Sequence, residues 1–357
     1  MKRDVSEEAS VTIGLDLGDT YSYAFAIDAD GVMVEEGRVR TTRAGIMRFL
    51  KDRDPCRIAL EVGTHSPWVS RFVSDLGHEV LVANARKLRA IYCNELKSDR
   101  IDAEMLARIA RLDPQLLYPI RHRGAVAQTD LARIRSRAAL VRARTLLINH
   151  VRGLVKAFGK RLPKCGTRSF SSKAAAHIPE ELQAALHPLL STITELSQQI
   201  DRQQRAIVKL AADSYPETAS LQQVFGVGPV TALTYVLTLQ DPTRFQKSRD
   251  VAAYLGLTPR RRQSGDHEPE LRISKTGDAD LRRLLVQAAQ YILGPFGPET
   301  ALRVWGLTLA NRGGKRAKRR AVVAVARKLA VLLHRLWLTG DVYAPAGLPT
   351  EQNAEAA

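Results

Sequence analysis

Two short apolar runs near the start of the chain each carry an acidic residue at their end, and this pattern constrains the fold most. Asp16 ends the apolar part of VTIGLDLG, and Glu61 ends that of RIALEVG. Both runs are short, aliphatic and bounded by glycine, which predicts buried strands. Carboxylates at strand ends can meet at one edge of a sheet, so Asp16 and Glu61 are candidates for a shared site.

A second acidic pair, Asp99 and Asp102, lies in KSDRIDAEMLARIARL. This segment is predicted to be a helix, in which residues three apart share a face. Clustered carboxylates raise each other's pKa unless a cation neutralises them, and their hard oxygen atoms suit Mg²⁺ or Mn²⁺. The sequence therefore predicts metal-assisted phosphate chemistry at these four acids. Taken singly, Asp99 has a plainer interpretation as a helix cap, a role that Ser98 also fits.

The apolar runs between Val11 and Asn84 follow a fixed order. Two strands joined by hairpins precede strand–helix–strand units, which predicts a mixed sheet. The expected strands are 11–18, 21–28, 32–40, 57–63 and 78–84, and the expected helices are 42–53 and 66–77. This order, with acids at the ends of the first and fourth strands, is that of a ribonuclease H-like α/β domain, which we expect over residues 10–127.

A helical segment is expected over residues 128–215. Its two long helices carry apolar residues at three- and four-residue spacing, which fits an antiparallel hairpin or coiled coil and fits a plain helical bundle equally well. The apolar positions are Leu131, Ile134, Ala138, Val141, Leu146 and Val151 in the first helix, and Ile193, Leu196, Ile200 and Ile207 in the second. Arginines crowd the first helix and are predicted to bind nucleic-acid phosphates, namely Arg133, Arg137, Arg142 and Arg144.

A mostly helical domain is expected over residues 216–345. Its segment FGVGPVTA has the form of a helix–hairpin–helix motif, with Gly226 and Gly228 in the turn and Pro229 at a helix start. Amide groups at such a start can bind a DNA phosphate. A glycine-rich turn between core helices is an equally good interpretation.

The charge of the chain indicates a polyanionic partner. Its 357 residues include 54 Lys and Arg against 37 Asp and Glu, a net charge of +17 with a pI near 10.1. Nucleic acid is favoured over membrane, since no apolar run reaches spanning length and no secretory signal opens the sequence. Cys56, Cys93 and Cys165 form no CxxC pair and suit a reducing cytoplasm, so we expect a cytoplasmic protein.

A serine between basic segments is a further candidate. Ser264 follows PRRRQ and precedes Gly265, and RISK follows at 272–275. On residue chemistry alone, the favoured interpretation is a basic phosphate-binding loop with Arg260, Arg261 and Lys275, in which the serine only donates a hydrogen bond. A nucleophilic Ser264 is the alternative. Ser274 is the lesser candidate and is expected to cap a helix.

GLDLGDT also resembles the first phosphate loop of actin-like ATPases and sugar kinases. Those folds need a second glycine-rich phosphate loop, where this chain has basic segments, so the kinase interpretation is rejected.

Taken together, the motifs resemble those of the insertion sequence 110 family of transposases, in order and over nearly the whole chain from Val11 to about Tyr343. The matching pieces are GLDLG, ALEVG, KSDRIDA, TDLARIRSRAALVRARTLLIN, FGVGPVTA, AAYLGLTPRRRQSG, RISKTGDADLRRLL and AVVAVARKL. This resemblance implies a RuvC-like nuclease domain with a DEDD quartet at Asp16, Glu61, Asp99 and Asp102, and a separate transposase domain with a catalytic Ser264.

The same resemblance implies an enzyme that cuts and rejoins DNA through a phosphoserine, with Mg²⁺ or Mn²⁺, a structured guide RNA and a homodimer or homotetramer whose protomers share active sites. The chain departs from the family where SSGG becomes Gln263-Ser264-Gly265-Asp266 and GRISK becomes LRISK. Two alternatives remain: a RuvC-like junction-resolving nuclease that uses water, and a non-catalytic nucleic-acid scaffold.

Overall fold

The computed structural model describes residues 10–88, 98–260 and 271–346. The chain divides into two compact units, Met1–Arg123 and Gly124–Ala357. The division into three domains, with boundaries at 127/128 and 215/216, stays a prediction. No helix in the described ranges is long and apolar enough to cross a membrane.

The first unit contains a five-stranded mixed sheet with the strand order β3-β2-β1-β4-β5. The first three strands pair antiparallel, and β4 and β5 run parallel to β1. The strands are β1 (Val11–Asp16), β2 (Tyr21–Asp28), β3 (Met33–Arg40), β4 (Arg57–Glu61) and β5 (Glu79–Ala83). The five expected strands are therefore confirmed.

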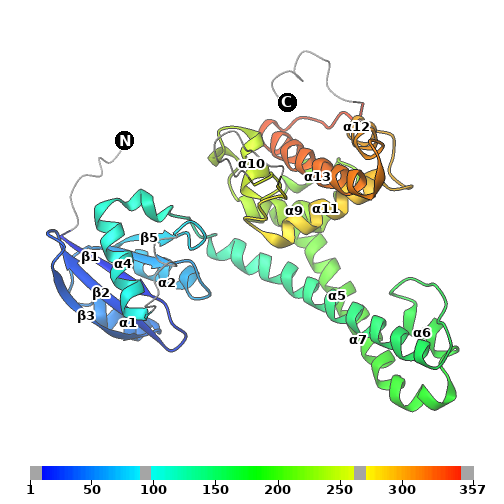
Figure 1. Cartoon of the computed structure of the whole chain (residues 1–357), viewed down its shortest axis with the longest axis horizontal. Helices are drawn as coiled ribbons and strands as arrows, with labels where there is room; N and C mark the ends of the chain where they lie inside the picture. Colours follow the sequence, from blue (N-terminus) through cyan, green and yellow to red (C-terminus); the bar gives the residue numbers. More distant parts are fainter. Residues whose placement is uncertain (1–9, 89–97, 261–270, 347–357) are drawn as a thin grey trace. The chain divides into compact units, whose positions relative to one another are not determined.

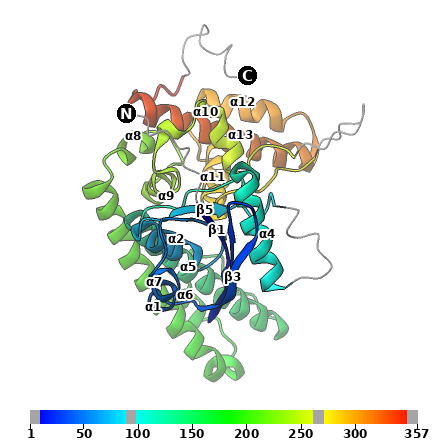
Figure 2. The ribbon, with the colours of Figure 1, turned by 90° about the vertical axis from the view of Figure 1, so that its left-hand side faces the viewer.

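Helices cover both faces of this sheet (Figures 1 and 2). On one face, α1 (Arg43–Leu50) and α2 (Ser66–Asp75) pack against strand residues such as Ile13 and Leu60. On the other face, α4 (Asp99–Leu112) packs against Phe25 and Ala59, and the short helix η1 (Pro114–Leu117) follows it. Alternate strand residues point to opposite faces, so β2, β4 and β5 contribute to both cores. This arrangement is consistent with the ribonuclease H-like domain that the sequence predicts.

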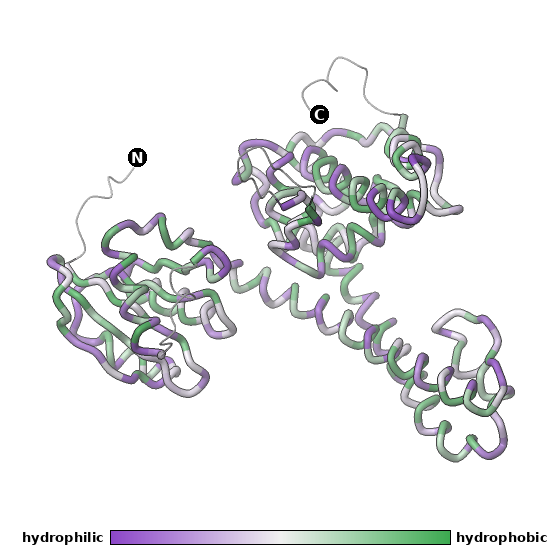
Figure 3. The backbone as a smooth tube through the Cα atoms, viewed as in Figure 1, coloured by the Kyte–Doolittle hydropathy of each residue, from purple (hydrophilic) through white to green (hydrophobic). Residues whose placement is uncertain are grey.

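The second unit opens with two long helices, α5 (Ala125–Ala157) and α7 (Glu180–Ser214), with the short α6 (Phe170–Ala175) between them. Residues early in α5 pack against residues late in α7 and vice versa, so the two helices are antiparallel (Figure 1). Polar and apolar residues alternate along both helices in Figure 3. The buried residues of α7 include a seven-residue series that is typical of a coiled coil: Leu186, Ile193, Ile200 and Ile207.

One predicted apolar contact of α5 is wrong. Leu146 is 67% exposed, whereas Ile148 and Val151 face α7 in the core of the pair. The three-and-four rhythm allows two neighbouring stripes on a long helix, and the partner helix covers only one of them.

The rest of the second unit is a helical bundle around one core. Its helices are α8 (Thr218–Gln222), α9 (Pro229–Leu239), η2 (Pro242–Arg244), α10 (Ser248–Tyr254), α11 (Ala279–Leu293), α12 (Ala301–Ala310) and α13 (Gly314–Thr339). The fully buried Tyr235 of α9 donates a hydrogen bond to the Ala330 carbonyl oxygen of α13 at 2.7 Å, so the buried hydroxyl of Tyr235 is satisfied.

Candidate active site

Asp16 and Glu61 end two neighbouring parallel strands of the sheet. In the register of β1 and β4, Leu15 is paired with Leu60, and each acid is the next residue along its strand. Both side chains are half-buried. The two carboxylates therefore share one edge of the sheet, as the sequence predicts.

The face on which these acids lie follows from Gly14. Ile13 and Leu15 face α1 and α2, so Gly14 and Asp16 face the opposite side, where α4 lies. A Cβ atom at Gly14 would overlap the carbonyl oxygen of Ala103 and lie 2.7 Å from the amide nitrogen of Ala107. Glycine at this position therefore lets the backbone of α4 rest directly on β1.

Helix α4 runs antiparallel to β1 and β4, which brings its first turn to the acidic edge. Its end lies at the start of β4, where Arg57 donates a hydrogen bond to the Ala110 carbonyl oxygen at 3.2 Å. Its other end carries Asp99 and Asp102, and Asp102 directly precedes the Ala103 that contacts Gly14. The Ser98 hydroxyl caps the helix by accepting a hydrogen bond from the Ile101 amide at 3.3 Å, so Asp99 is not needed as the cap.

The four acids differ in burial at this edge. Asp102 is only 7% exposed, Asp16 and Glu61 are half-buried, and Asp99 is exposed. As the side chains lie, the described ranges contain no group of three or more His, Cys, Asp or Glu residues arranged to hold a metal ion. The donors have the chemistry that Mg²⁺ requires, and the metal site itself stays a prediction.

The turn that follows Asp16 is fixed by hydrogen bonds. The Thr41 hydroxyl donates to the Gly18 carbonyl oxygen at 2.9 Å and lies 2.8 Å from the Ser22 hydroxyl. A Cβ atom at Gly18 would overlap the Tyr21 carbonyl oxygen. The glycine and the hydroxyl pair therefore hold the chain in a tight turn directly after the acid.

A histidine beside the same edge was missed in the sequence. Nε2 of His65 lies 3.2 Å from a carboxylate oxygen of Asp19, and the Trp68 indole donates to Nδ1 of His65 at 3.1 Å. Since Nδ1 accepts, Nε2 carries the hydrogen that faces Asp19. Asp19 follows Asp16 by three residues and His65 follows Glu61 by four, and that sequence spacing is the signal that could have revealed them.

Ser264 and Arg261 lie outside the described residues, but the two ends of their segment are held together. The Arg260 amide donates to the Arg272 carbonyl oxygen at 3.0 Å, and the Ser274 amide donates to that of Thr258 at 2.9 Å. Pro259 and Ile273 form a β-bridge. The residues on the two sides of the segment, 258–260 and 272–274, are therefore held together at one fixed point.

Two glycines lock the base of this segment. Gly256 and Gly277 have φ values of +67° and +70°. A Cβ atom at Gly256 would overlap the backbone of Thr276, and one at Gly277 would overlap the carbonyl oxygen of Tyr254. The guanidinium of Arg282 donates to the carbonyl oxygens of Leu255, at 2.9 Å, and Thr276, at 2.6 Å. The motifs YLGL and SKTG thus interlock through backbone contacts.

Ser274 is not the helix cap that the sequence predicts. Helix α11 begins at Ala279, and Asp278 caps it by accepting hydrogen bonds from the amides of Asp280 and Leu281 at 3.0 and 2.9 Å. Lys275 has a positive φ of 55°, so the chain turns between Ser274 and the helix. The Ser274 hydroxyl instead lies 3.0 Å from that of Thr276.

The four arginines predicted to bind nucleic acid occupy two environments. Arg133 and Arg142 are exposed, whereas Arg137 and Arg144 are half-buried along α5. Arg144 donates to the Ser197 hydroxyl of α7 at 3.1 Å. Burial lowers the pKa of both half-buried guanidinium groups, and for Arg137 the neighbouring Arg144 lowers the pKa further.

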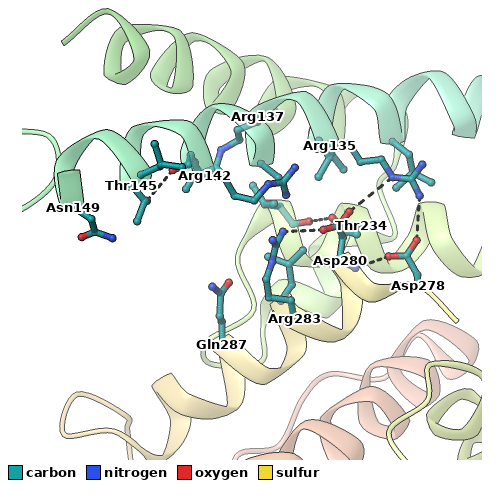
Figure 4. Close-up of a pocket in the computed structure, with 17 residues that line it drawn as sticks. Arg135, Arg137, Arg142, Thr145, Asn149, Thr234, Asp278, Asp280, Arg283 and Gln287 are labelled. Carbon is teal, nitrogen blue, oxygen red and sulfur yellow. Dashed lines mark hydrogen bonds and ion pairs between the residues drawn. The ribbon is translucent and has the colours of Figure 1, made fainter. Parts of the chain in front are cut away.

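A groove of about 560 Å³ lies beside these arginines, between α5, α9 and α11 (Figure 4). Arg135, which the sequence did not single out, pairs there with Asp278 at 3.3 Å, and Arg283 pairs with Asp280 at 3.0 Å. The Asp278 that caps α11 therefore also ties α5 to the base of the Ser264 segment.

The predicted hairpin glycines lie between α8 and α9. Gly226 has a φ of +85°, and a Cβ atom there would lie 3.0 Å from the Ala288 carbonyl oxygen of α11. Gly228 is exposed and precedes Pro229, the first residue of α9. Gly226 thus allows α11 to pack closely, while Gly228 leaves the start of α9 open to solvent.

Comparisons with known proteins agree with the order of these features. A family model described as transposase, of the DEDD type, matches residues 13–159. A second, described as the transposase IS116/IS110/IS902 family, matches residues 218–304.

Curated bacterial relatives match along most of their length. The transposase for insertion sequence element IS1328 of Yersinia enterocolitica is 31% identical, over 78% of this chain and 82% of the relative. The putative transposase y4pF/y4sB of Sinorhizobium fredii is also 31% identical, over 96% and 87%. A probable family 20 transposase of Pseudomonas aeruginosa is 28% identical, over 93% and 98%. This chain therefore belongs to the IS116/IS110/IS902 family of transposases, enzymes that act on DNA.

Proposed function

We propose that this transposase cuts and rejoins the DNA strands of its insertion sequence through a covalent phosphoserine at Ser264. The observation that carries the proposal is the convergence of Asp16, Glu61 and the first turn of α4 on one sheet edge. The anchored, arginine-flanked base of the Ser264 segment supports it.

In the proposed step, Oγ of Ser264 attacks a DNA phosphorus atom. The Oγ–P bond forms, the bond from phosphorus to one deoxyribose oxygen breaks, and that oxygen leaves with a proton as a hydroxyl. The serine proton passes to a nearby base. Because one phosphodiester replaces another, the reverse attack by a strand end can rejoin DNA without an energy source.

The family's divalent cation fits the acidic edge by donor chemistry. Asp16, Glu61, Asp99 and Asp102 would hold Mg²⁺ or Mn²⁺, which supplies positive charge near the reacting phosphate. The exposed guanidinium of Arg260 and the ammonium of Lys275, at the base of the Ser264 segment, would bind the flanking phosphates.

The nucleic-acid contacts belong to the same proposal. We infer a RuvC-like first domain, a coiled-coil α5–α7 pair and a helix–hairpin–helix around Gly226 and Gly228 that binds phosphates. A structured guide RNA would supply sequence choice by base pairing, since phosphate contacts carry none. Acids and serine lie in different units of the chain, so we propose a homodimer or homotetramer with shared active sites, acting in the bacterial cytoplasm.

A denaturing gel of protein mixed with labelled element-junction DNA and its RNA tests the nucleophile. Wild type should form a protein–DNA adduct, and Ser264→Ala should lose it while still binding nucleic acid. Ser274→Ala is the matched control and should keep the adduct, because its hydroxyl only contacts Thr276. An adduct in Ser264→Ala would refute the serine mechanism.

The acidic edge also favours a second candidate, a nuclease in which water replaces Ser264. That enzyme would release protein-free ends with either serine variant. A separate experiment tests the shared active site. When the Asp16→Asn protein is mixed with the Ser264→Ala protein, one intact centre should form from the two defective protomers, and the protein–DNA adduct should reappear.

A further inference from the structure

The last two helices of the described chain carry an unusual charge. From Thr300 to Gly340 the sequence has ten Lys and Arg and no Asp or Glu. Six of these cations crowd the turn between α12 and α13 and the first turns of α13, and all six are exposed: Arg312, Lys315, Arg316, Lys318, Arg319 and Arg320. This basic run is separate from the arginines of α5 and from the base of the Ser264 segment along the sequence.

The first two turns of α13, residues 314–320, extend beyond the core of the bundle, and we call them the overhang. Lys318 and Arg319 precede Val325 and Ala326 by seven residues, so the two pairs share one face of the helix. Val325 and Ala326 are fully buried, whereas Lys318 and Arg319 are exposed. Within the overhang Ala317 is half-buried, and the other six residues are exposed. At about 100° per residue, the five cations of the overhang span roughly 200° of the helix circumference, and Gly314 and Ala317 occupy the remaining face. A stretch with so wide a charged face gains little stability from packing.

Ion pairs do not explain four of these charges either. Lys315, Arg316, Lys318 and Arg319 have no acidic partner among the described residues, and the first turn of α13 has no acidic residue. Several cations side by side at the positive end of a helix repel one another and the helix dipole. The overhang is therefore costly by itself, and a polyanion would remove that cost.

We propose that the overhang inserts into the major groove of duplex DNA and binds phosphates on both sides of the groove. A helix is about 10–12 Å wide with its side chains, and the major groove is about 12 Å wide. Cations on one face would suffice on an open surface, whereas a groove has phosphates on both walls. The charged face of the overhang is wider than half the helix circumference, so its cations can reach both walls, which fits the second geometry.

Duplex RNA fits less well, because the major groove of an A-form helix is deep and too narrow for side chains to read. Single strands fit less well because the overhang has no aromatic residue on which bases could stack. The inference rests on the proposed function only in assuming that DNA is bound, and it adds the surface that holds the duplex.

The test removes four charges while keeping the helix. In Lys315→Gln/Arg316→Gln/Lys318→Gln/Arg319→Gln, glutamine has nearly the helix propensity of the residues it replaces. We expect affinity for a non-specific DNA duplex to fall about tenfold or more near 0.1 M salt, and the slope of log K against log salt to decrease by about 3 to 4. The control Lys156→Gln/Lys160→Gln/Arg161→Gln/Lys164→Gln removes the same charge from exposed positions at the end of α5 and beyond it, and should change the slope less.

Three results would overturn the inference: an unchanged slope in the overhang variant, an equal loss in the control variant, or an equal loss on duplex RNA. A DNA duplex with glucosylated cytosines, whose major groove is blocked, should bind wild type as weakly as the overhang variant binds plain DNA. Arg316→Lys/Arg319→Lys should bind like wild type, which separates charge from folding. Duplex binding is measured without cleavage, so a wild type that forms no adduct would refute the phosphoserine and leave this result readable.

Discussion

The contact between Gly14 and α4 can be tested with a single methyl group. In Gly14→Ala the new Cβ would overlap the Ala103 carbonyl oxygen and lie 2.7 Å from the Ala107 amide nitrogen. Non-bonded heavy atoms need about 3.5 Å or more, so α4 must move away from β1 by roughly 1 Å. Both of these atoms belong to the backbone, so a change of side-chain rotamer cannot relieve the overlap.

Two effects of different size follow from that shift. Overpacking a core costs about 1–3 kcal/mol of unfolding free energy. A catalytic group misplaced by about 1 Å costs roughly 100-fold in rate, and Asp99 and Asp102 would move with α4. We therefore expect a folded protein with a modestly lower urea midpoint and about 100-fold less strand cleavage, although no acid has been changed.

The matched control is Gly63→Ala, two residues after Glu61, where a Cβ atom meets nothing within 4 Å. It should keep both stability and cleavage. If Gly14→Ala cleaves DNA like the Gly63→Ala control, α4 does not position its acids through this contact and the reasoning is wrong.

Two further predictions concern charge. Arg144→Met should lower the unfolding free energy by about 1 kcal/mol, because it removes the hydrogen bond to Ser197. Arg142→Met, at an exposed position, should only weaken nucleic-acid binding. Urea melts and salt-dependent binding of both variants check this, and equal losses of stability would contradict it. Burial lowers the pKa of His78 and of His122, so the folded state favours their neutral forms. The stability that these neutral histidines contribute is fully present above the unfolded pKa of about 6.5, and it is lost as the pH falls through the lower folded pKa. The loss of stability between pH 7 and pH 5 in urea melts should therefore be smaller in His78→Asn/His122→Asn than in wild type, and an unchanged loss would contradict the assignment.

The sequence predicts the sheet and its acidic edge well, for a physical reason. Strand-end acids after apolar runs are visible as a pattern, and the pairing of β1 with β4 follows from the order of elements. The role of Gly14 is not visible, because a glycine inside a strand does not show which helix approaches it. The half-burial of Arg137 and Arg144 depends on the register of α7 against α5, which periodicity alone leaves open.

Local chemistry also misleads where two residues fit one role. Ser274 and Asp278 both precede α11 and both are good caps, and the choice depends on the left-handed turn at Lys275. Likewise, Leu146 fits the apolar rhythm of α5 but lies outside the stripe that α7 covers. In each case a tertiary contact decides between two locally acceptable structures.

The central claim is that the acidic edge and Ser264 act in one phosphoryl-transfer reaction. The most direct test measures the yield of the Ser264–DNA adduct across a Mg²⁺ titration in wild type, Asp16→Asn and the exposed control Asp75→Asn. Asp16→Asn removes the charge of a proposed metal ligand at nearly constant volume, so the account predicts no adduct at any Mg²⁺ concentration while DNA binding persists. Asp75→Asn should behave like wild type. A wild-type adduct yield from Asp16→Asn in saturating Mg²⁺ would contradict it.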